Sequence, residues 1–288
     1  MAGSIPGSAQ AGEATLAKAL LGRPEALLGA AILLALILVA VFAPLIAPGD
    51  PLAIAGAPLI PPFTDPALPL GTDRLGRDLL AELIHGARTS ISVGLSAALV
   101  AVVLGMSVGT AAGFAGGLTE AMLMRLVDAF QIVPGFLLAL AFVSAAGPSL
   151  GIVVLAIALG AWTGPARLAR ARVLSLRETD FVAAARVMGM SPAEIAFRQI
   201  LPLALPPVLA VASVIVAAAV LTEAALSFLG LGDPNAITWG AMIAEGRNQL
   251  RSASYLSIIP GIALVLTVIS TYLLGEALTD ILSGRRNR

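Results

Sequence analysis

Long apolar runs alternate with shorter polar segments along this chain. They cover residues 27–46, 91–112, 122–146, 150–162, 203–221 and 256–274, the fourth of these being only the start of a span. A helix rises about 1.5 Å per residue and needs about 20 apolar residues to cross a hydrocarbon core of about 30 Å. The pattern therefore predicts an all-α integral membrane protein with six transmembrane helices.

The composition supports the membrane class and excludes several kinds of site. Hydrophobic residues make up 58% of the 288 residues, charged residues make up 12%, and the mean hydropathy is +0.97. In soluble domains roughly a quarter of all residues are charged. Cysteine is absent, which excludes disulfides, thiol nucleophiles and Cys-based metal sites. Because His85 is the only histidine, a multi-histidine metal site within this chain is also excluded.

The apolar pattern divides the chain into four parts. We expect a cytoplasmic N-terminal tail at 1–26, a first transmembrane helix at 27–47, an extracytoplasmic loop at 48–88, and a core of five transmembrane helices at 89–288. The first apolar run is too long for a signal peptide and is not followed by a cleavage pattern, so it is read as a retained anchor.

Arginine placement predicts the orientation. An even number of spans puts both termini on one side, and cytoplasmic loops carry an excess of cations. The opposite face mixes Arg74, Arg77 and Arg88 with more numerous carboxylates. We therefore expect both termini and the polar segment 178–202 between spans four and five to be cytoplasmic. The cations on that side are Arg167, Arg170, Arg172, Arg177, Arg186 and Arg198 between spans four and five, and Arg285, Arg286 and Arg288 at the C-terminus.

The polar segment 178–202, ETDFVAAARVMGMSPAEIAFRQILP, predicts a helical elbow between two spans. Helix formers fill 180–188, and Gly189 follows where a helix end favours a positive φ. Ser191, Pro192 and Glu194 then stand at the N-cap, first and third positions of a second helix. We expect this second helix to end at Leu201-Pro202. Such an elbow suits docking of a soluble partner; the alternative is an amphipathic elbow lying on the membrane surface.

Charged residues near the predicted outer ends of the spans are candidate site residues. Thr72-Asp73 can cap a helix, and Asp73 and Arg77 would then stand four apart on one helical face. Such a pair is more often a locally stabilising contact than a ligand site, and its functional alternative is a polar lip over an outer mouth. Trp239 follows a glycine-rich turn and suits the headgroup level of the membrane.

Charges inside or beside apolar runs are costly and often functional. Glu223 lies within the fifth apolar region, where it could face a translocation path or another subunit. We expect Arg125 and Asp128 to pair across one helical turn, and Glu276 and Asp280 to meet water or the arginine tail. Pro134-Gly135 predicts a kink in the third span that faces a partner helix.

The elbow also resembles the cytoplasmic loop of ABC importer permeases. That loop has the pattern Glu-Ala-Ala, three residues, Gly, nine residues, Ile, one residue and Leu-Pro. In this chain Ala183 and Gln199 replace the glutamate and the isoleucine of the pattern. Glu178 or Asp180 is available to supply the charge of the missing glutamate. The resemblance implies docking into a groove on an ATP-hydrolysing subunit. The residues that it assigns to coupling are Asp180, Ala183, Ala184, Ala185, Gly189, Leu201 and Pro202.

Two further stretches resemble one branch of that family. LGTDRLGRDLLAELIHGARTSISVGL at 70–95 and EAALSFLGLGDPNAITWGAMIAEGR at 223–247 are similar to segments of dipeptide, oligopeptide and nickel importer permeases, and the first span with its long loop resembles the C-type subunit. The resemblance implies a type I ABC importer permease fold in a bacterial or archaeal cytoplasmic membrane. It also implies a second permease, two ATP-binding subunits that hold ATP and Mg, and an extracytoplasmic solute-binding protein.

The remaining function classes are judged by what the sequence lacks. There is no G-x-x-x-x-G-K-[ST] loop, and Lys18 is the only lysine, so we expect no ATPase activity, cofactor or metal in this chain. Nothing indicates nucleic-acid binding. An intramembrane hydrolase is disfavoured because His85 has no nearby nucleophile-like serine turn. The stronger alternative is an ion-gradient-driven secondary transporter, with Glu223 or Asp128 as its coupling residue; against it, no clear internal repeat is seen.

Overall fold

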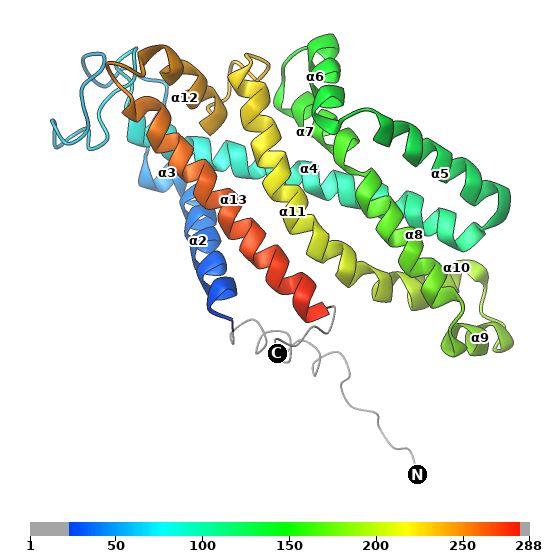
Figure 1. Ribbon diagram of the computed structural model, residues 1–288. Helices are drawn as coiled ribbons and strands as arrows, with labels where there is room; N and C mark the ends of the chain where they lie inside the picture. Colours follow the sequence, from blue (N-terminus) through cyan, green and yellow to red (C-terminus); the bar gives the residue numbers. More distant parts are fainter. Residues whose placement is uncertain (1–22, 283–288) are drawn as a thin grey trace.

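The computed structural model describes residues 23–282, and its regular elements in that range are helices (Figure 1). Four helices are long and apolar enough to cross a membrane, and the number rises to six when each of two bent pairs is counted as one span. The predicted all-α membrane fold is therefore confirmed. The predicted tail at 1–26 lies mostly outside the described residues, as do Arg285, Arg286 and Arg288.

The first half of the chain contains two straight spans and one broken one. Its helices are α2 (Pro24–Val41), α3 (Ala43–Ile46), α4 (Leu79–Ala115), α5 (Gly117–Ile132) and α6 (Gly135–Ala146). The α4 helix is longer than the apolar run 91–112 because Asp78 caps it, its side chain accepting a hydrogen bond from Leu80 N at 2.9 Å.

The second half contains another broken span, the elbow and two further spans. Its elements are α7 (Leu150–Ala161), α8 (Thr163–Arg177), α9 (Asp180–Val187), α10 (Pro192–Glu194), the π-helical η1 (Ile195–Ile200), α11 (Leu201–Phe228), α12 (Trp239–Gly246), the 3₁₀-helical η2 (Arg247–Gln249) and α13 (Tyr255–Leu282).

The predicted kink at Pro134-Gly135 is a sharp break. The α5 and α6 helices meet at 83°, and the α7 and α8 helices meet at 46°. Val133 is extended, as expected before a proline that cannot continue the helix. A Cβ on Gly135 would lie 3.0 Å from Gly160 O, so the absence of a side chain lets the two broken spans approach closely.

The expected helix end at Leu201-Pro202 is wrong. Residues Pro192–Phe228 form one helical span of 37 residues. Leu201 N bonds to Ala196 O in a π-type turn, immediately before Pro202, which has no N–H to donate. The second arm of the elbow, residues 192–200, is therefore continuous with the fifth span. The first arm is α9.

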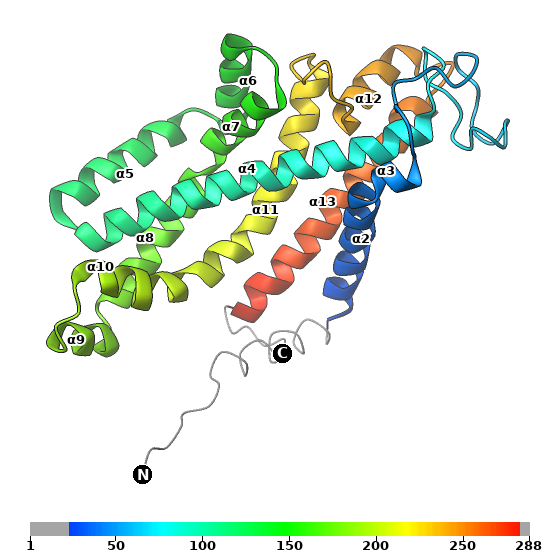
Figure 2. The ribbon, with the colours of Figure 1, turned by 180° about the vertical axis from the view of Figure 1, so that it is seen from behind.

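The α4 helix is the centre of the bundle. It packs against α2, α5, α7, α8 and α11, while α13 lies between α2 and α11. Both views show α4 crossing α11 and α13 obliquely (Figure 1, Figure 2). The loop 47–78 and α12 gather at one end of the molecule, and α9 and α10 lie at the opposite end.

The described ends of the first and last spans lie on the same side as α9 (Figure 1, Figure 2). Arg23, before α2, pairs with Asp280 near the end of α13 at 2.9 Å. The expected partners of Asp280 were water or the C-terminal arginines, and those arginines lie outside the described residues. The pair joins the start of the first span to the end of the last one.

Candidate functional site

The first arm of the elbow ends at the predicted glycine corner. Gly189 has a φ of 81°, and Met190 N bonds to Ala185 O while Gly189 N bonds to Arg186 O. These two bonds form a Schellman motif, which satisfies carbonyls that the end of α9 would otherwise leave unpaired. The prediction of a helix followed by a glycine corner is confirmed.

The second arm begins at the predicted cap. The Ser191 side chain accepts a hydrogen bond from Glu194 N at 3.2 Å, and Pro192 occupies the first turn. The Glu194 carboxylate does not complete a reciprocal capping box, because it pairs with Arg198 at 2.9 Å on the same helix face. The serine cap is confirmed, and the glutamate serves an i, i+4 ion pair.

A small core of its own supports the elbow. Val182 and Ala185 of α9 pack with Ile195 and Ile200 of the second arm, together with Val173 of α8 and Ala204 of α11. All six side chains are buried. Since close-packed side chains leave little free volume, the elbow is built to move as one piece with the ends of α8 and α11.

The outer face of the elbow exposes large apolar side chains. Val187 is 89% exposed and Met188 is 74% exposed at the end of α9, Phe197 is 68% exposed in η1, and Arg186 and Arg198 are exposed in the same two segments. Exposed apolar side chains accompanied by cations are typical of a contact surface. Of the residues predicted to act in coupling, Ala185 is buried under the elbow and Leu201 is partly buried; those that are exposed are Asp180, Ala183, Ala184, Gly189 and Pro202.

Ion pairs brace the span next to the elbow. Asp128 of α5 pairs with Arg167 of α8 at 2.6 Å, and Glu120 of α5 pairs with Arg170 of α8 at 2.7 Å. The expected pair between Arg125 and Asp128 is therefore wrong, because α8 brings a better-placed guanidinium to the carboxylate than the neighbouring turn does. These pairs hold the broken third span against the helix that leads to the elbow.

The opposite end is organised around Asp73, which does not cap a helix as predicted. Its Oδ1 accepts hydrogen bonds from Leu75 N at 2.7 Å and Arg77 N at 2.8 Å, which closes a turn ahead of α4. Thr72 belongs to the same loop, where its hydroxyl donates to Ala57 O at 2.6 Å. Tyr255 of α13 donates its hydroxyl towards Ile60 O and Thr72 O, both at 3.1 Å. The loop is thus held by hydrogen bonds within itself and by hydrogen bonds from the tyrosine of the last span.

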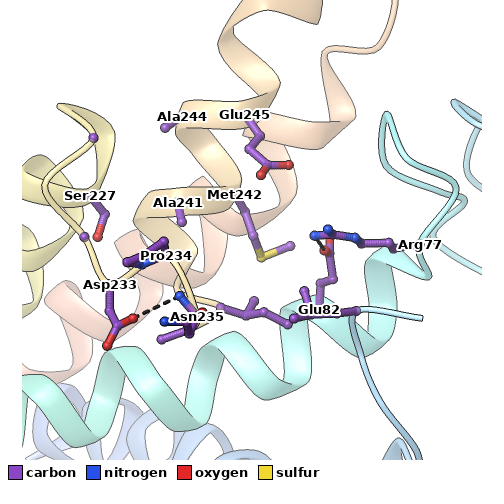
Figure 3. Close-up of a pocket in the computed structure, with 15 residues that line it drawn as sticks. Arg77, Glu82, Ser227, Asp233, Pro234, Asn235, Ala241, Met242, Ala244 and Glu245 are labelled. Atoms are coloured by element: carbon purple, nitrogen blue, oxygen red, sulfur yellow. Dashed lines mark hydrogen bonds and ion pairs between the residues drawn. The ribbon is translucent and has the colours of Figure 1, made fainter. Parts of the chain in front are cut away.

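Arg77 links this loop to α4. Its guanidinium lies 3.9 Å from Asp73 Oδ2 and 3.5 Å from Glu82 Oε1, and both carboxylates are buried. Arg77 and Glu82 also line a pocket of about 350 Å³ together with the turn after α11 and the face of α12 that carries Met242 and Glu245 (Figure 3).

Replacing Arg77 with alanine should loosen the loop from α4. Two buried carboxylates then lose their cation, which costs less than the roughly 3–5 kcal/mol typical of a fully buried pair because Arg77 keeps some exposure. We expect faster proteolytic cleavage within 48–78, measured on the purified protein. An Arg88→Ala variant is the control, since Arg88 forms no ion pair within the described residues, and equal cleavage of both variants would contradict the role of Arg77.

Trp239, for which we expect a place at the headgroup level of the membrane, is buried inside the protein. Its side chain is 1% exposed, its ring packs against Gly86 of α4, and its Nε1 donates to Leu83 O at 3.1 Å. The glycine in α4 provides the space for the indole, because a Cβ there would lie 3.2 Å from the ring. Trp239 therefore fastens the start of α12 to α4.

Glu223 lies beside this tryptophan and is 2% exposed. Ser227 Oγ donates to its Oε1 at 2.7 Å, and Ser90 Oγ of α4 donates to its Oε2 at 3.4 Å. In this arrangement the carboxylate points into the contact between α4, α11 and α12. Sequence reasoning found Glu223 but missed Ser90, Ser227 and Thr238. What these three share in the sequence is a hydroxyl group close to the end of an apolar run.

Comparison with known proteins gives consistent matches. Residues 89–288 match the family model described as "Binding-protein-dependent transport system inner membrane component". The chain is 41% identical over 271 residues to a probable peptide ABC transporter permease protein of Sinorhizobium fredii, covering 92% of this chain and 90% of the relative. It is 37% identical over 266 residues to the di/tripeptide transport system permease protein DppC of Pseudomonas aeruginosa, covering 90% and 88%.

A solved structure matches the fold. The inward-facing MetNI methionine ABC transporter contains a chain with a TM-score of 0.56 and 21% identity, covering 73% of this chain and 98% of that one. At this level of identity the match supports the fold alone, and it agrees with the bundle described above.

Proposed function

This chain belongs to the family of binding-protein-dependent transport system inner membrane components, and we propose that it is the C-type permease subunit of an ATP-driven importer of di- or oligopeptides. It is a multi-pass membrane protein and a permease of the ABC importer class, which transports solute and is not itself an enzyme. The peptide substrate is supported by the names of relatives at 36–41% identity that cover most of the chain.

The observation that carries the coupling proposal is the exposed apolar face on a rigidly supported elbow. Val187, Met188 and Phe197 of the elbow are exposed, while Val182 and Ala185 of the same elbow belong to a closed core. A partner that covers this face gains apolar burial, and its movement reaches α8 and α11 through packed side chains. We place the ATP-binding subunits, with their ATP and Mg, on this face, and accordingly place the elbow and both termini in the cytoplasm.

The opposite end then faces the extracytoplasmic side. The loop 48–78, the pocket beside Glu82 and Glu245, and the ion-paired Asp73 and Arg77 form its polar surface. We propose that this surface is the lip that meets the solute-binding protein, and that solute passes between this subunit and a second permease. We keep the division into a first span at 27–47, an extracytoplasmic segment at 48–88 and a core at 89–288, although α4 already begins inside the second of these, at Leu79.

The first test is co-purification of the tagged chain from its native membrane. We expect wild type to bring a second permease and two ATP-binding subunits, and a Val187→Glu, Met188→Glu double variant to lose the ATP-binding subunits because it places charge in an apolar contact. Ile54→Glu is the control, since Ile54 is 76% exposed in the loop at the end of the molecule opposite the elbow.

Transport by the purified complex completes the test. Liposomes should import di- or tripeptides only when ATP and the solute-binding protein are both supplied. A wild-type chain that purifies alone and transports with an ion gradient in the absence of ATP would contradict the proposal. That result would favour the alternative, an ion-gradient-driven secondary transporter.

A further inference from the structure

A buried polar cluster joins three helices at the end of the molecule opposite the elbow. Glu223 of α11 accepts hydrogen bonds from Ser227 of its own helix and from Ser90 of α4. Thr238, the N-cap of α12, donates its hydroxyl to Ser227 Oγ at 3.4 Å. Trp239 N donates to Ser90 Oγ at 3.1 Å. We call these five residues the outer latch; Glu223 is its only charged member, and no ion pair of Glu223 occurs within residues 23–282.

Close backbone packing reinforces the outer latch. A Cβ on Gly240 would lie 2.5 Å from Ala224 Cα, so α12 touches the backbone of α11 directly. On the other side, the Trp239 ring occupies the space left by Gly86 of α4. The start of α12 is therefore fixed to both neighbours by backbone contact as well as by the polar cluster.

Glu223 also stands at the far end of the span that begins at the elbow. Pro192–Phe228 is one helical span, and the 31 residue-to-residue steps from Pro192 to Glu223 correspond to a path of about 45 Å along the helix. The elbow core holds one end of this span through Ile195 and Ile200. The outer latch holds the other end to α12.

We infer that Glu223 is a positioning residue that carries movement of the elbow to α12, so that α12 and the outer ends of α4 and α11 shift as one block when the extracytoplasmic mouth opens. Separating them would leave a buried carboxylate and several hydroxyls without partners, which is unfavourable. Moving the block intact keeps every bond. This inference rests on the proposed importer function and assigns Glu223 to the transmission of movement, not to contact with solute.

The test compares two replacements of Glu223 in the assembled complex. Glu223→Ala removes both acceptor oxygens, and we expect ATP-dependent import to fall at least about tenfold while the ATP-binding subunits stay bound and hydrolyse ATP. Glu223→Gln keeps the shape and an acceptor, and should restore most of the import. Ser90→Ala removes one partner without touching the carboxylate and should give an intermediate loss. Ser270→Ala is the control, because Ser270 is fully buried but bonds only within its own helix.

A distance measurement separates transmission from general damage. The chain has no cysteine, so spin labels at Leu221→Cys on α11 and Asn248→Cys beyond α12 meet no background from this chain, and any exposed cysteines of the partner subunits are replaced first. We expect one narrow distance in wild type, unchanged when ATP is trapped, and a broad distribution in Glu223→Ala.

Three results would overturn the inference. They are import by Glu223→Ala at the wild-type rate, a wild-type distance that changes on ATP trapping, or a Glu223→Ala distance as narrow as that of wild type. Failure of the proposed function is seen separately, as a wild-type complex without ATP-dependent import, and the inference would fall with it.

Discussion

Replacing Gly109 with leucine is expected to prevent α4 and α8 from packing, and so to abolish the folded protein. A Cβ at this position would lie 2.2 Å from Ala166 O and 2.8 Å from Ala169 Cβ. Gly105 and Gly113, one turn away on either side, also approach α8 closely, since an added Cβ would lie 2.6 Å from Pro165 Cβ and 3.0 Å from Arg170 O, respectively. Small residues at this spacing let two membrane helices touch backbone to backbone, and a larger side chain removes the dispersion contacts that hold them.

The expected loss of folding free energy exceeds the roughly 1–3 kcal/mol that ordinary overpacking costs, because the obstructing atom is a backbone carbonyl oxygen that cannot rotate away. The measurement is the fraction of detergent-solubilised protein that runs as a single species, together with its thermal unfolding midpoint. Gly151→Leu in α7 is the matched control, since nothing lies within 4 Å of its added Cβ. Equal behaviour of the two variants would refute the account of α4–α8 packing.

Replacing Gly189 with valine is expected to uncouple ATP hydrolysis from import. An added Cβ meets nothing within 4 Å, so the whole effect comes from the backbone, where a φ of 81° is unfavourable for a β-branched residue. A left-handed conformation costs an ordinary residue roughly 1–2 kcal/mol, and the corner relieves this strain by opening the Schellman motif. Import by the complex should then fall about tenfold or more, while its ATPase activity persists.

Gly189→Asn gives the comparison, because asparagine tolerates the left-handed region and should keep most of the import. Both activities are measured on the same reconstituted preparation, with subunit content checked by gel. Normal peptide import by Gly189→Val in a fully assembled complex would show that the elbow does not need this corner.

The elbow was predictable because its signals are local. Gly189, Ser191 and Pro192 each act on the backbone within one turn, so their spacing alone predicts a helix, a corner and the start of a second helix, as observed. The end at Leu201-Pro202 was mispredicted for a related reason. A proline at the start of a helix and a proline that ends one look alike in sequence, and here a π-type turn carries the chain past it.

The contacts between spans were less predictable because they join residues far apart in the chain. Asp128 pairs with Arg167 and not with the nearby Arg125, and Trp239 is buried only because Gly86 and Ser90 meet it across 149 or more residues. An apolar run gives no indication of which of its small or hydroxyl residues will face a partner helix. The spans could therefore be predicted from hydropathy, while the contacts between them could not.

The length of α4 affects how this protein fits different bilayers. At 37 residues it extends for about 55 Å, which exceeds a hydrocarbon core of about 30 Å by several turns. Glu82 and its arginine partner lie near the first turn of this helix, and the Gly116 corner follows its last turn. Because α4 crosses its neighbours obliquely, a change in bilayer thickness can be met by a small change in tilt. The central helix thus tolerates hydrophobic mismatch without drawing an ion pair into lipid.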